Sequence, residues 1–454
     1  MSLRARFWLL AGIRWLSTGF IVPVAALLPL DRGLTVAEYG TVAAVQGITV
    51  LVLELPTGGF ADAIGRRPVW IASAVVAFVS YGVYALAQTP AVFAVATALA
   101  GAYRALDSGP LNAWFVDAVH DREPEQTRSA VVANGLSGYA SVVGLAIATG
   151  AVLSAALVAW APLGDGQALV VPYWVAAALS VVQIGAAVVL MDEDRSARIG
   201  GLVGAIRATP AAILDGTRLL LGSRVLRALV AVEIFWGFGM IAFETLTPIR
   251  LSELLGDRDA AAALMGPVTA AAWGVSALGA AMVPLLLRRW SMVAVSVALR
   301  LVQGATVVAM GIAGGPVGLV AGLFATYAVH SAAGAIHETL LHEQVGNEQR
   351  ATVLSLGSMV LHPGASIGLV VLGAVATAAS TGAAIVVGGL VLALAAPLFL
   401  VRAPAPAAVR GAPMLDREGT PVAPTRLQEA SPWANSYDSR SATESGRSDS
   451  TGPR

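Results

Sequence analysis

Long runs of apolar residues, separated by short polar segments, occupy the first 401 residues of the chain. Most runs have about the ~20 residues that a helix needs to cross the hydrocarbon core of a bilayer. Twelve runs can be recognised, at about 7–30, 39–60, 69–88, 91–118, 129–160, 172–191, 227–250, 262–287, 292–314, 316–341, 352–378 and 382–401. The pattern therefore predicts an all-α membrane protein with twelve transmembrane helices.

The twelve runs form two groups of six, because one long charged stretch separates the sixth run from the seventh. The end of the chain belongs to neither group, since it is rich in Pro, Ala, Ser, Thr and mixed charge and has too few aliphatic residues to form a core. We therefore predict an N-terminal six-helix half at 1–191, a cytoplasmic central linker at 192–225, a C-terminal six-helix half at 226–401 and a disordered cytoplasmic tail at 402–454.

A weak internal repeat supports the division into two halves. The segment EQTRSAV at 125–131 resembles NEQRATV at 347–353, and Trp15 lies at nearly the same offset in the first half as Trp236 in the second. We therefore expect the first and fourth runs to correspond to the seventh and tenth.

The composition agrees with a polytopic membrane protein. The chain is 57% hydrophobic and only 12% charged, too little charge to cover a soluble protein of this length. Its formal net charge is zero, so no overall field attracts nucleic acid. The chain has no cysteine, which excludes disulfides and thiolate metal sites.

Arginine is concentrated in alternate loops. If the N-terminus is cytoplasmic, the outer loops hold only Arg32, Arg250 and Arg258. The inner loops then hold Arg4, Arg6, Arg66, Arg67, Arg122, Arg128, Arg288, Arg289 and Arg350. The positive-inside rule therefore predicts a multi-pass plasma-membrane protein with both termini in the cytoplasm. Aromatic belts are expected at the outer surface, from Trp160, Tyr173 and Trp174, and at the inner surface, from Trp70 and Trp290.

The link between the second and third runs reads GGFADAIGRRP, at 58–68. It resembles the signature loop of the major facilitator superfamily of transporters, roughly G-x-x-x-D-x-x-G-R-R/K. The residues on this pattern are Gly58, Asp62, Gly65, Arg66 and Arg67. The resemblance implies two parallel, pseudo-symmetric six-helix halves, and a latch at this loop that biases the equilibrium between two conformations. Glu54, one turn earlier, is expected to share the gating role.

Charged residues inside membrane spans are costly and indicate functional sites. The superfamily resemblance implies that spans one, four, seven and ten line a central cavity. We predict that the substrate cavity contains Arg14, Trp114, Glu233 and His337. Arg300 in span nine and His362 in span eleven are interpreted as structural.

Proton coupling is predicted at Asp107, whose proton affinity depends both on burial and on Arg104 one turn away. His330 and Glu244 are the alternative coupling groups, and imidazole titrates near neutral pH unaided. A different interpretation stays open, in which Arg104 with Asp107, or Arg14 with Asp107 or Glu233, forms a static ion pair.

The resemblance to proton-coupled drug exporters is partial. Those transporters carry R-x-x-Q-G in span four, whereas AYRALDSG at 102–109 has Arg104, replaces the Gln by Asp107 and places Gly109 one residue late. We predict proton-coupled efflux of a hydrophobic or amphipathic compound by a monomer, with proton-coupled uptake of a metabolite and a non-transporting membrane sensor as alternatives. The expected partners are the small-molecule substrate, protons and the lipid bilayer.

No enzyme motif is present, and no Walker-type loop that would bind ATP. We therefore predict that the chain is not an enzyme and needs no cofactor. His337 and His342 lie five residues apart, not at the i, i+4 spacing that faces a single metal ion, so no metal site is expected.

Overall fold

The computed structural model describes residues 1–192, 218–345 and 350–401. Within these ranges, the side chains of 55–63, 165 and 350–355 are not described. Most of the predicted linker and the whole predicted tail therefore lie outside the described residues.

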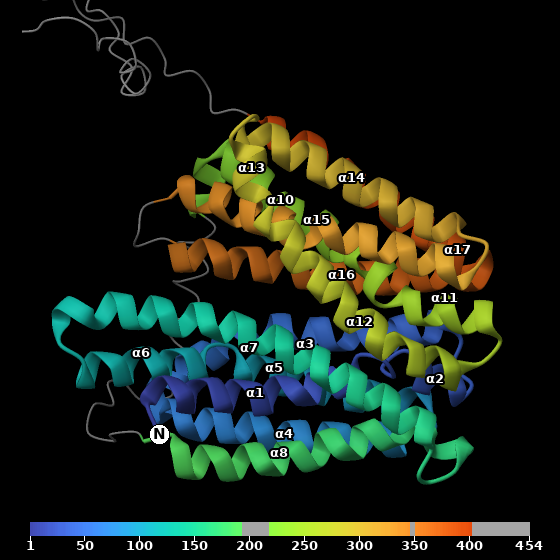
Figure 1. Cartoon of the computed structure of the whole chain (residues 1–454), viewed down its shortest axis with the longest axis horizontal. Helices are drawn as coiled ribbons and strands as arrows, with labels where there is room; N and C mark the ends of the chain where they lie inside the picture. Colours follow the sequence, from blue (N-terminus) through green and yellow to red (C-terminus); the bar gives the residue numbers. More distant parts are fainter. Residues whose placement is uncertain (193–217, 346–349, 402–454) are drawn as a thin grey trace, which may run out of the picture. The chain divides into compact units, whose positions relative to one another are not determined.

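The described part of the chain is helical, without a strand, and its helices make twelve passes, as predicted (Figure 1). The N-terminal half contains α1 (Leu3–Ile21), α2 (Leu27–Asp31), α3 (Val36–Ile64), α4 (Arg66–Leu86), α5 (Pro90–Asp107), α6 (Pro110–Arg122), α7 (Glu125–Trp160), the 3₁₀ helix η1 (Asp165–Val170) and α8 (Val171–Leu190). The C-terminal half contains α10 (Arg224–Glu244), α11 (Leu246–Leu255), α12 (Arg258–Ala281), α13 (Val283–Leu287), α14 (Met292–Ile312), α15 (Pro316–Glu343), α16 (Arg350–Ala378), α17 (Thr381–Leu394) and η4 (Ala396–Leu400).

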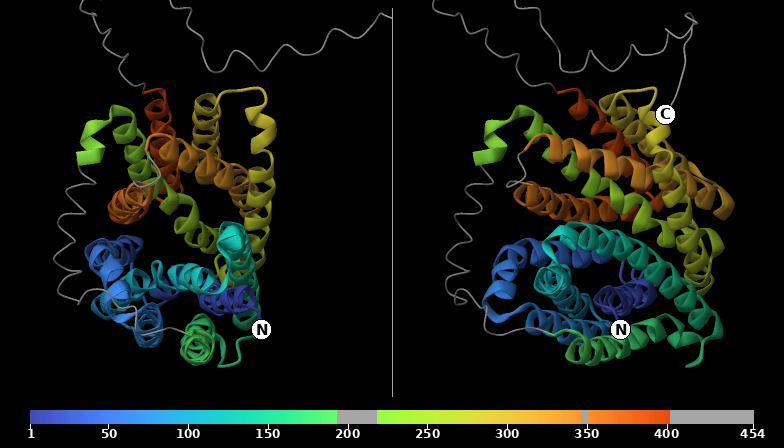
Figure 2. Two further views of the ribbon diagram at one scale, coloured as in Figure 1. Left: turned by 90° about the vertical axis from the view of Figure 1, so that its left-hand side faces the viewer. Right: turned by 60° about the vertical axis from the view of Figure 1, so that its left-hand side comes forward.

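The two halves repeat one packing scheme. In the first half, α1 packs on α7 and α8, α5 packs on α3 and α4, and α4 packs on α8. In the second half, α10 packs on α16 and α17, α15 packs on α12 and α14, and α14 packs on α17. Each contact has its counterpart, so the halves are pseudo-symmetric. Figures 1 and 2 show the two halves as separate groups of helices.

The halves meet along two helix pairs, α3 with α16 and α7 with α12. Small residues allow the close approach, as is common between membrane helices. A Cβ atom added at Gly373 of α16 would lie 2.8 Å from the carbonyl oxygen of Val36 at the start of α3. Nearby, the amide of Ala37 donates to Thr377 Oγ1 at 3.0 Å, and Arg258 pairs with Asp31 at 3.7 Å.

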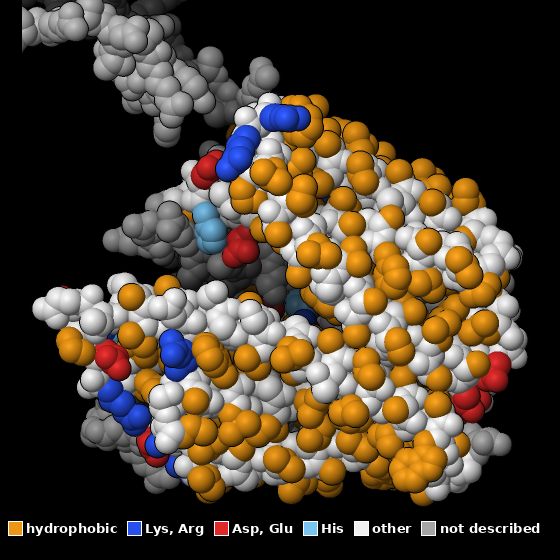
Figure 3. All heavy atoms as spheres, viewed as in Figure 1, with side chains coloured by type: hydrophobic (Ala, Val, Ile, Leu, Met, Phe, Trp, Pro, Cys, Tyr) orange, Lys and Arg blue, Asp and Glu red, His pale blue; other side chains and the backbone are white. Residues whose placement is uncertain are grey.

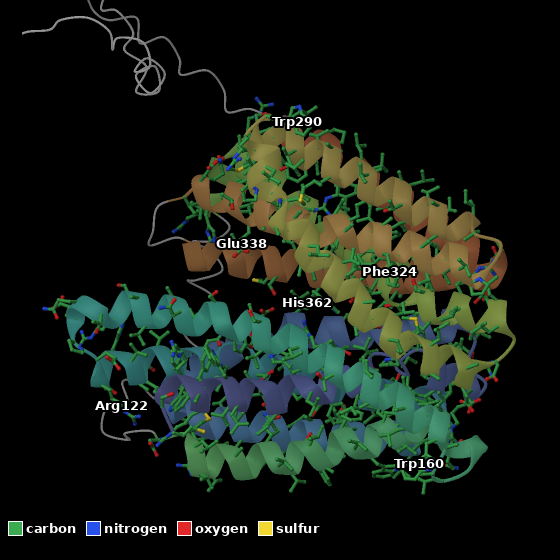
Figure 4. All side chains as sticks on the ribbon, viewed as in Figure 1. Arg122, Trp160, Trp290, Phe324, Glu338 and His362 are labelled. Carbon is green, nitrogen blue, oxygen red and sulfur yellow. The ribbon has the colours of Figure 1, made fainter. Side chains whose placement is uncertain are left out.

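These contacts join the halves at the end opposite the arginine-rich loops. At the other end, Figure 3 shows the surface hollowed between the halves, and Figure 4 places Arg122 and Glu338 there. Trp160 lies at the joined end (Figure 4). A hollow of about 680 Å³ lies at the joined end too, between α2, α11 and α12.

Among the described residues, ten helical segments are long and apolar enough to cross a membrane. The first and fourth spans are not among them, because α1 carries Arg4, Arg6 and Arg14, and α5 ends in Arg104 and Asp107. Both still make full passes, since their polar side chains are packed inside the N-terminal half or face the space between the halves. Charged residues also occur inside some of the ten apolar segments, for example Glu233 and Glu244 in Arg224–Leu255 and Arg300 in Met292–Ile312.

The fourth pass is broken between α5 and α6. Gly109 takes a φ of 98°, which favours glycine, and Pro110 begins α6 because its fixed φ suits the first helical position. Asp107 is thus the last residue of α5, whereas Trp114 lies on a separate helix.

Two members of the expected aromatic belts are buried, so their assignment to the membrane surface is wrong. Trp70 is 0% exposed because it packs in the core of the first half and donates to Asp107. Tyr173 is 1% exposed because it stacks on Tyr84, with ring centroids 4.6 Å apart. Trp160 and Trp290 are exposed, as a belt requires.

Candidate substrate cavity

A cavity of about 500 Å³ lies between the two halves. Helix α5 contributes Arg104 from the first half, and the other lining residues come from four helices of the second half. They are Glu233, Trp236, Arg300, His330, Ser331, Gly334, His337, Glu338, Leu341, Gly357, Ser358, Leu361 and His362. Figure 4 shows His362 between the halves. The volume is typical of a small-molecule site.

Arg300 is the most deeply buried cation of this cavity, with 3% of its side chain exposed. Its guanidinium lies 5.0 Å from the ring centre of Trp236, and its NH1 donates to Gln303 Oε1 at 3.0 Å. Its Nε has no hydrogen-bond partner among the described residues. The sequence interpretation of Arg300 as merely structural missed this position. The signal was its charge in the middle of an apolar run.

Glu233 and His337, both predicted in the substrate cavity, lie together. The distance from His337 Nε2 to Glu233 Oε1 is 2.9 Å, and both side chains are largely buried. The imidazole also meets the ring of Phe399 edge-on, at 5.7 Å. A protonated His337 would form an ion pair with Glu233, so this contact depends on protonation.

His330 lies inside a cluster of aromatic rings. Trp236, Phe243, Trp273 and Tyr327 each have ring centres 5.1 to 6.0 Å from the imidazole. Tyr327 also donates to Glu244 Oε1 at 3.5 Å, which places the two alternative coupling groups near one another. Trp236 and His330 of this cluster line the cavity and form its aromatic wall, whereas Phe243, Trp273 and Tyr327 are not among the lining residues.

Arg104 lines the cavity and does not pair with Asp107. It lies close enough to Glu54, Glu244 and His362 to interact with each electrostatically. Within the described part of the chain, no carboxylate lies at ion-pair distance from Arg104. His362, interpreted from the sequence as a packing residue, is thus a neighbour of the cavity's central cation.

Asp107 is bonded on both oxygens within the first half. Arg14 Nε donates to Oδ2 at 2.7 Å, and Trp70 Nε1 donates to Oδ1 at 2.9 Å. Arg14 is buried, and its guanidinium also lies over the rings of Trp15 and Tyr103. Neither Arg14 nor Asp107 is among the residues that line the cavity.

Trp114, predicted in the substrate cavity, lies elsewhere. It is buried in the core cluster around Phe7 and Phe115, and its indole donates to the carbonyl of Asp192 at 2.8 Å. It thereby anchors the end of α8 rather than a substrate.

The predicted gating loop joins several helices. Gly65 takes a φ of 107° between α3 and α4, Arg66 lies 3.5 Å from Asp117 of α6, and Arg67 donates to the carbonyl of Val188 in α8 at 2.8 Å. Glu54 accepts from Ser358 of α16 at 3.0 Å, across the two halves. The side chains of Gly58 and Asp62 lie outside the described residues.

The comparisons with known proteins decide the family. The model of the major facilitator superfamily matches residues 7–337. The chain belongs to the major facilitator superfamily. It is therefore a membrane-embedded transporter of a small molecule and not an enzyme. No curated protein matches the chain.

Solved transporters of this superfamily share the fold. The nucleoside transporter NupG is 12% identical, with a TM-score of 0.70 over 88% of this chain and 98% of that one. The human organic anion transporter MFSD10 (TETRAN) is 18% identical, with a TM-score of 0.58 over 87% of this chain and 98% of that one. Identities this low establish the arrangement of helices, while the substrate depends on this chain's own cavity.

Proposed function

We propose that this transporter exports a small amphipathic solute across the plasma membrane, as a monomer, in exchange for protons. The observation that supports the proposal is the cavity between the halves. It takes residues from both halves, while α3 and α16 pack closely at the joined end. A site that two rigid halves share can be exposed first to one side and then to the other when they rock.

The lining supports an amphipathic substrate. Trp236, Leu341 and Leu361 offer apolar surface beside the charged groups Arg104 and Arg300. A purely hydrophobic solute would leave these guanidiniums without a polar partner, at a cost in binding free energy. We therefore narrow the sequence prediction of a hydrophobic or amphipathic compound to an amphipathic one.

The cavity favours Glu233 with His337 as the proton-coupling pair. Both line the space that the solute would occupy, and their 2.9 Å contact changes with protonation. From other helices, the charged group Arg300 interacts with Glu233, and the ring of Phe399 covers His337. Asp107, the coupling group predicted from the sequence, is bonded to Arg14 and Trp70 outside the cavity, which favours its alternative role as half of a static pair.

Proteoliposomes with a trapped pH-sensitive dye test this function. Addition of a transported amphipathic solute to vesicles with an imposed pH gradient should move protons, and an uncoupler should abolish solute accumulation. Inverted vesicles give the direction: solute accumulation inside them indicates export, and accumulation only in right-side-out vesicles indicates uptake.

Glu233→Gln is the decisive variant. It keeps the size of the side chain but removes its charge, so we expect solute exchange to persist while accumulation driven by the pH gradient is lost. Glu343→Gln, which alters an acid of α15 outside the cavity lining, is the matched control. Unchanged pH-driven accumulation by Glu233→Gln would remove this residue from the coupling mechanism.

A further inference from the structure

We infer that the solute carries an oxyanion, a carboxylate or a phosphate, on a planar aromatic body, and that Arg300 and Arg104 bind the oxyanion. This inference rests on the proposed transport through the central cavity and adds the chemical class of the substrate. The reason is that the carboxylates near the cavity have close polar partners, whereas its two arginines lack a carboxylate at ion-pair distance among the described residues.

The acids near the cavity each have a close donor or imidazole. Glu233 lies 2.9 Å from His337, and Glu338 lies 3.6 Å from His342. Glu54 accepts a hydrogen bond from Ser358. These carboxylates therefore need no cation from the substrate.

The two arginines lack such a partner. Arg300 is 3% exposed and bonds only to the neutral amide oxygen of Gln303, and its Nε is unbonded among the described residues. Glu233 interacts with it from beyond ion-pair distance and lies 2.9 Å from His337 Nε2. A buried charge of this kind is unfavourable unless something pairs with it.

Arg104 supplies the second cation from the opposite half. It lines the same cavity, where the acids in electrostatic reach, Glu54 and Glu244, already accept hydrogen bonds from Ser358 and Tyr327. The guanidinium fork matches an oxyanion in shape, because it can donate two parallel hydrogen bonds to it. An anion between Arg104 and Arg300 would therefore join the two halves.

The aromatic wall supports the other part of the inference, namely that the solute has a planar aromatic body. Trp236 already stacks under Arg300, and the rings of Trp273 and Tyr327 continue from it around His330. A planar aromatic body beside Trp236 would place its anionic group at Arg300. Aromatic rings pack favourably in offset or edge-on contacts, which adds to the burial of apolar area.

Four naphthalene compounds that carry different polar groups test the proposed substrate class. Thermal stabilisation of the purified, full-length protein in lipid nanodiscs would be titrated with 2-naphthoate, 2-naphthyl phosphate, the neutral 2-naphthamide and the cationic 2-naphthylmethylamine. We expect at least one of the two anions to bind about tenfold or more tightly than the amide and the amine, since hydrogen bonds between two charged groups are stronger than those to a neutral group. The better of the two anions distinguishes carboxylate from phosphate recognition.

Arginine variants test whether Arg300 and Arg104 bind the oxyanion. Arg300→Gln and Arg104→Gln should each weaken anion binding about tenfold, and Arg300→Lys should restore part of it. Arg289→Gln, at an exposed arginine between α13 and α14, should bind like the wild type. If Arg300→Gln does not fold, Arg104→Gln carries the test, because the Arg104 side chain is exposed and lines the cavity.

Binding of the amide or the amine as tightly as the better of the two anions would overturn the inference. Wild-type affinity for the anions in folded Arg104→Gln and Arg300→Gln would overturn it too. Failure of both anions to stabilise the protein overturns it as well. The proposed function fails in a different assay, since anion binding without any proton-linked flux would refute coupled transport and leave the anion site in place.

Discussion

Replacement of Gly373 by alanine tests whether close packing of α3 on α16 holds one end of the transporter closed. The added methyl group would lie 2.8 Å from the carbonyl oxygen of Val36 and 3.3 Å from the Cα atom of Ala37. Both obstacles are backbone atoms, so no side chain can rotate away. The ends of the two helices must separate by a few tenths of an ångström.

The size of the effect follows from the cost of overpacking. An extra methyl group in a filled interface costs about 1–3 kcal/mol. In the opposite conformation, with the joined end open, these helix ends separate and the clash is relieved. The equilibrium should then shift toward that conformation by a factor of about 5 to 150, because about 1.4 kcal/mol corresponds to a tenfold change.

Cysteine labelling measures this shift. The chain has no cysteine, so a single one introduced at Ala44 reports alone. Ala44 is 3% exposed and lies on α3 where Ser366 of α16 donates to its carbonyl at 3.2 Å. Maleimide applied to the Arg258 side of the membrane should label Ala44→Cys at least about fivefold faster when Gly373→Ala is present.

Gly144→Ala is the control, because a Cβ atom there meets nothing within 4 Å. It adds the same methyl group to a helix of the bundle and should leave the labelling rate unchanged. An unchanged rate in a folded Gly373→Ala protein would refute the closure by this contact, as would equal acceleration by Gly144→Ala.

Three further predictions concern the charges and the topology. Asp107→Asn leaves Arg14 buried without a counter-charge, so the purified protein should lose about 3–5 kcal/mol of stability in thermal or denaturant unfolding; unchanged stability would contradict a static pair. Asp62→Asn should insert normally yet transport slowly in vesicles, and wild-type rates would exclude the latch. A reporter active only in the cytoplasm should work when fused after Arg402 and be silent within 161–171; activity in that loop would reverse the predicted orientation.

The twelve passes could be predicted because a bilayer imposes a minimum apolar length on every spanning helix. The break at Gly109 was also readable, since a Gly-Pro pair interrupts the fourth run. The single run predicted at 91–118 ignored this signal. The presence of a helix can therefore be predicted from local sequence. Whether two polar residues share a helix face also requires that one unbroken helix carries both.

Side-chain partners were less predictable, because they depend on tertiary packing. Asp107 and Arg104 are one turn apart, yet Asp107 bonds to Arg14, 93 residues earlier. The sequence left that pair open but could not choose it. Similarly, apolar periodicity could not tell that Arg300 faces the cavity, since α14 is apolar on most of its surface.

Because the halves are pseudo-symmetric, equivalent positions can be compared, and the two halves differ in their charged residues. An arginine stacks on the equivalent tryptophan in each half, Arg14 on Trp15 at 5.2 Å and Arg300 on Trp236 at 5.0 Å. In the first half, Asp107 neutralises the arginine. Counted from the proline that begins each helix, the position of Asp107 in α5 corresponds to Ala333 in α15.

The second half thus places a cation on the equivalent tryptophan, although from α14 and not from α10, and has no acid at the position of Asp107. By the same count, Arg104 corresponds to His330. The fourth span therefore has a guanidinium where the tenth span has an imidazole. With Ala333 at the position of Asp107, α15 offers Arg300 no counter-charge, which leaves that charge to be supplied by the solute. We therefore expect Ala333→Asp to compete with the anion for Arg300 and to weaken anion binding.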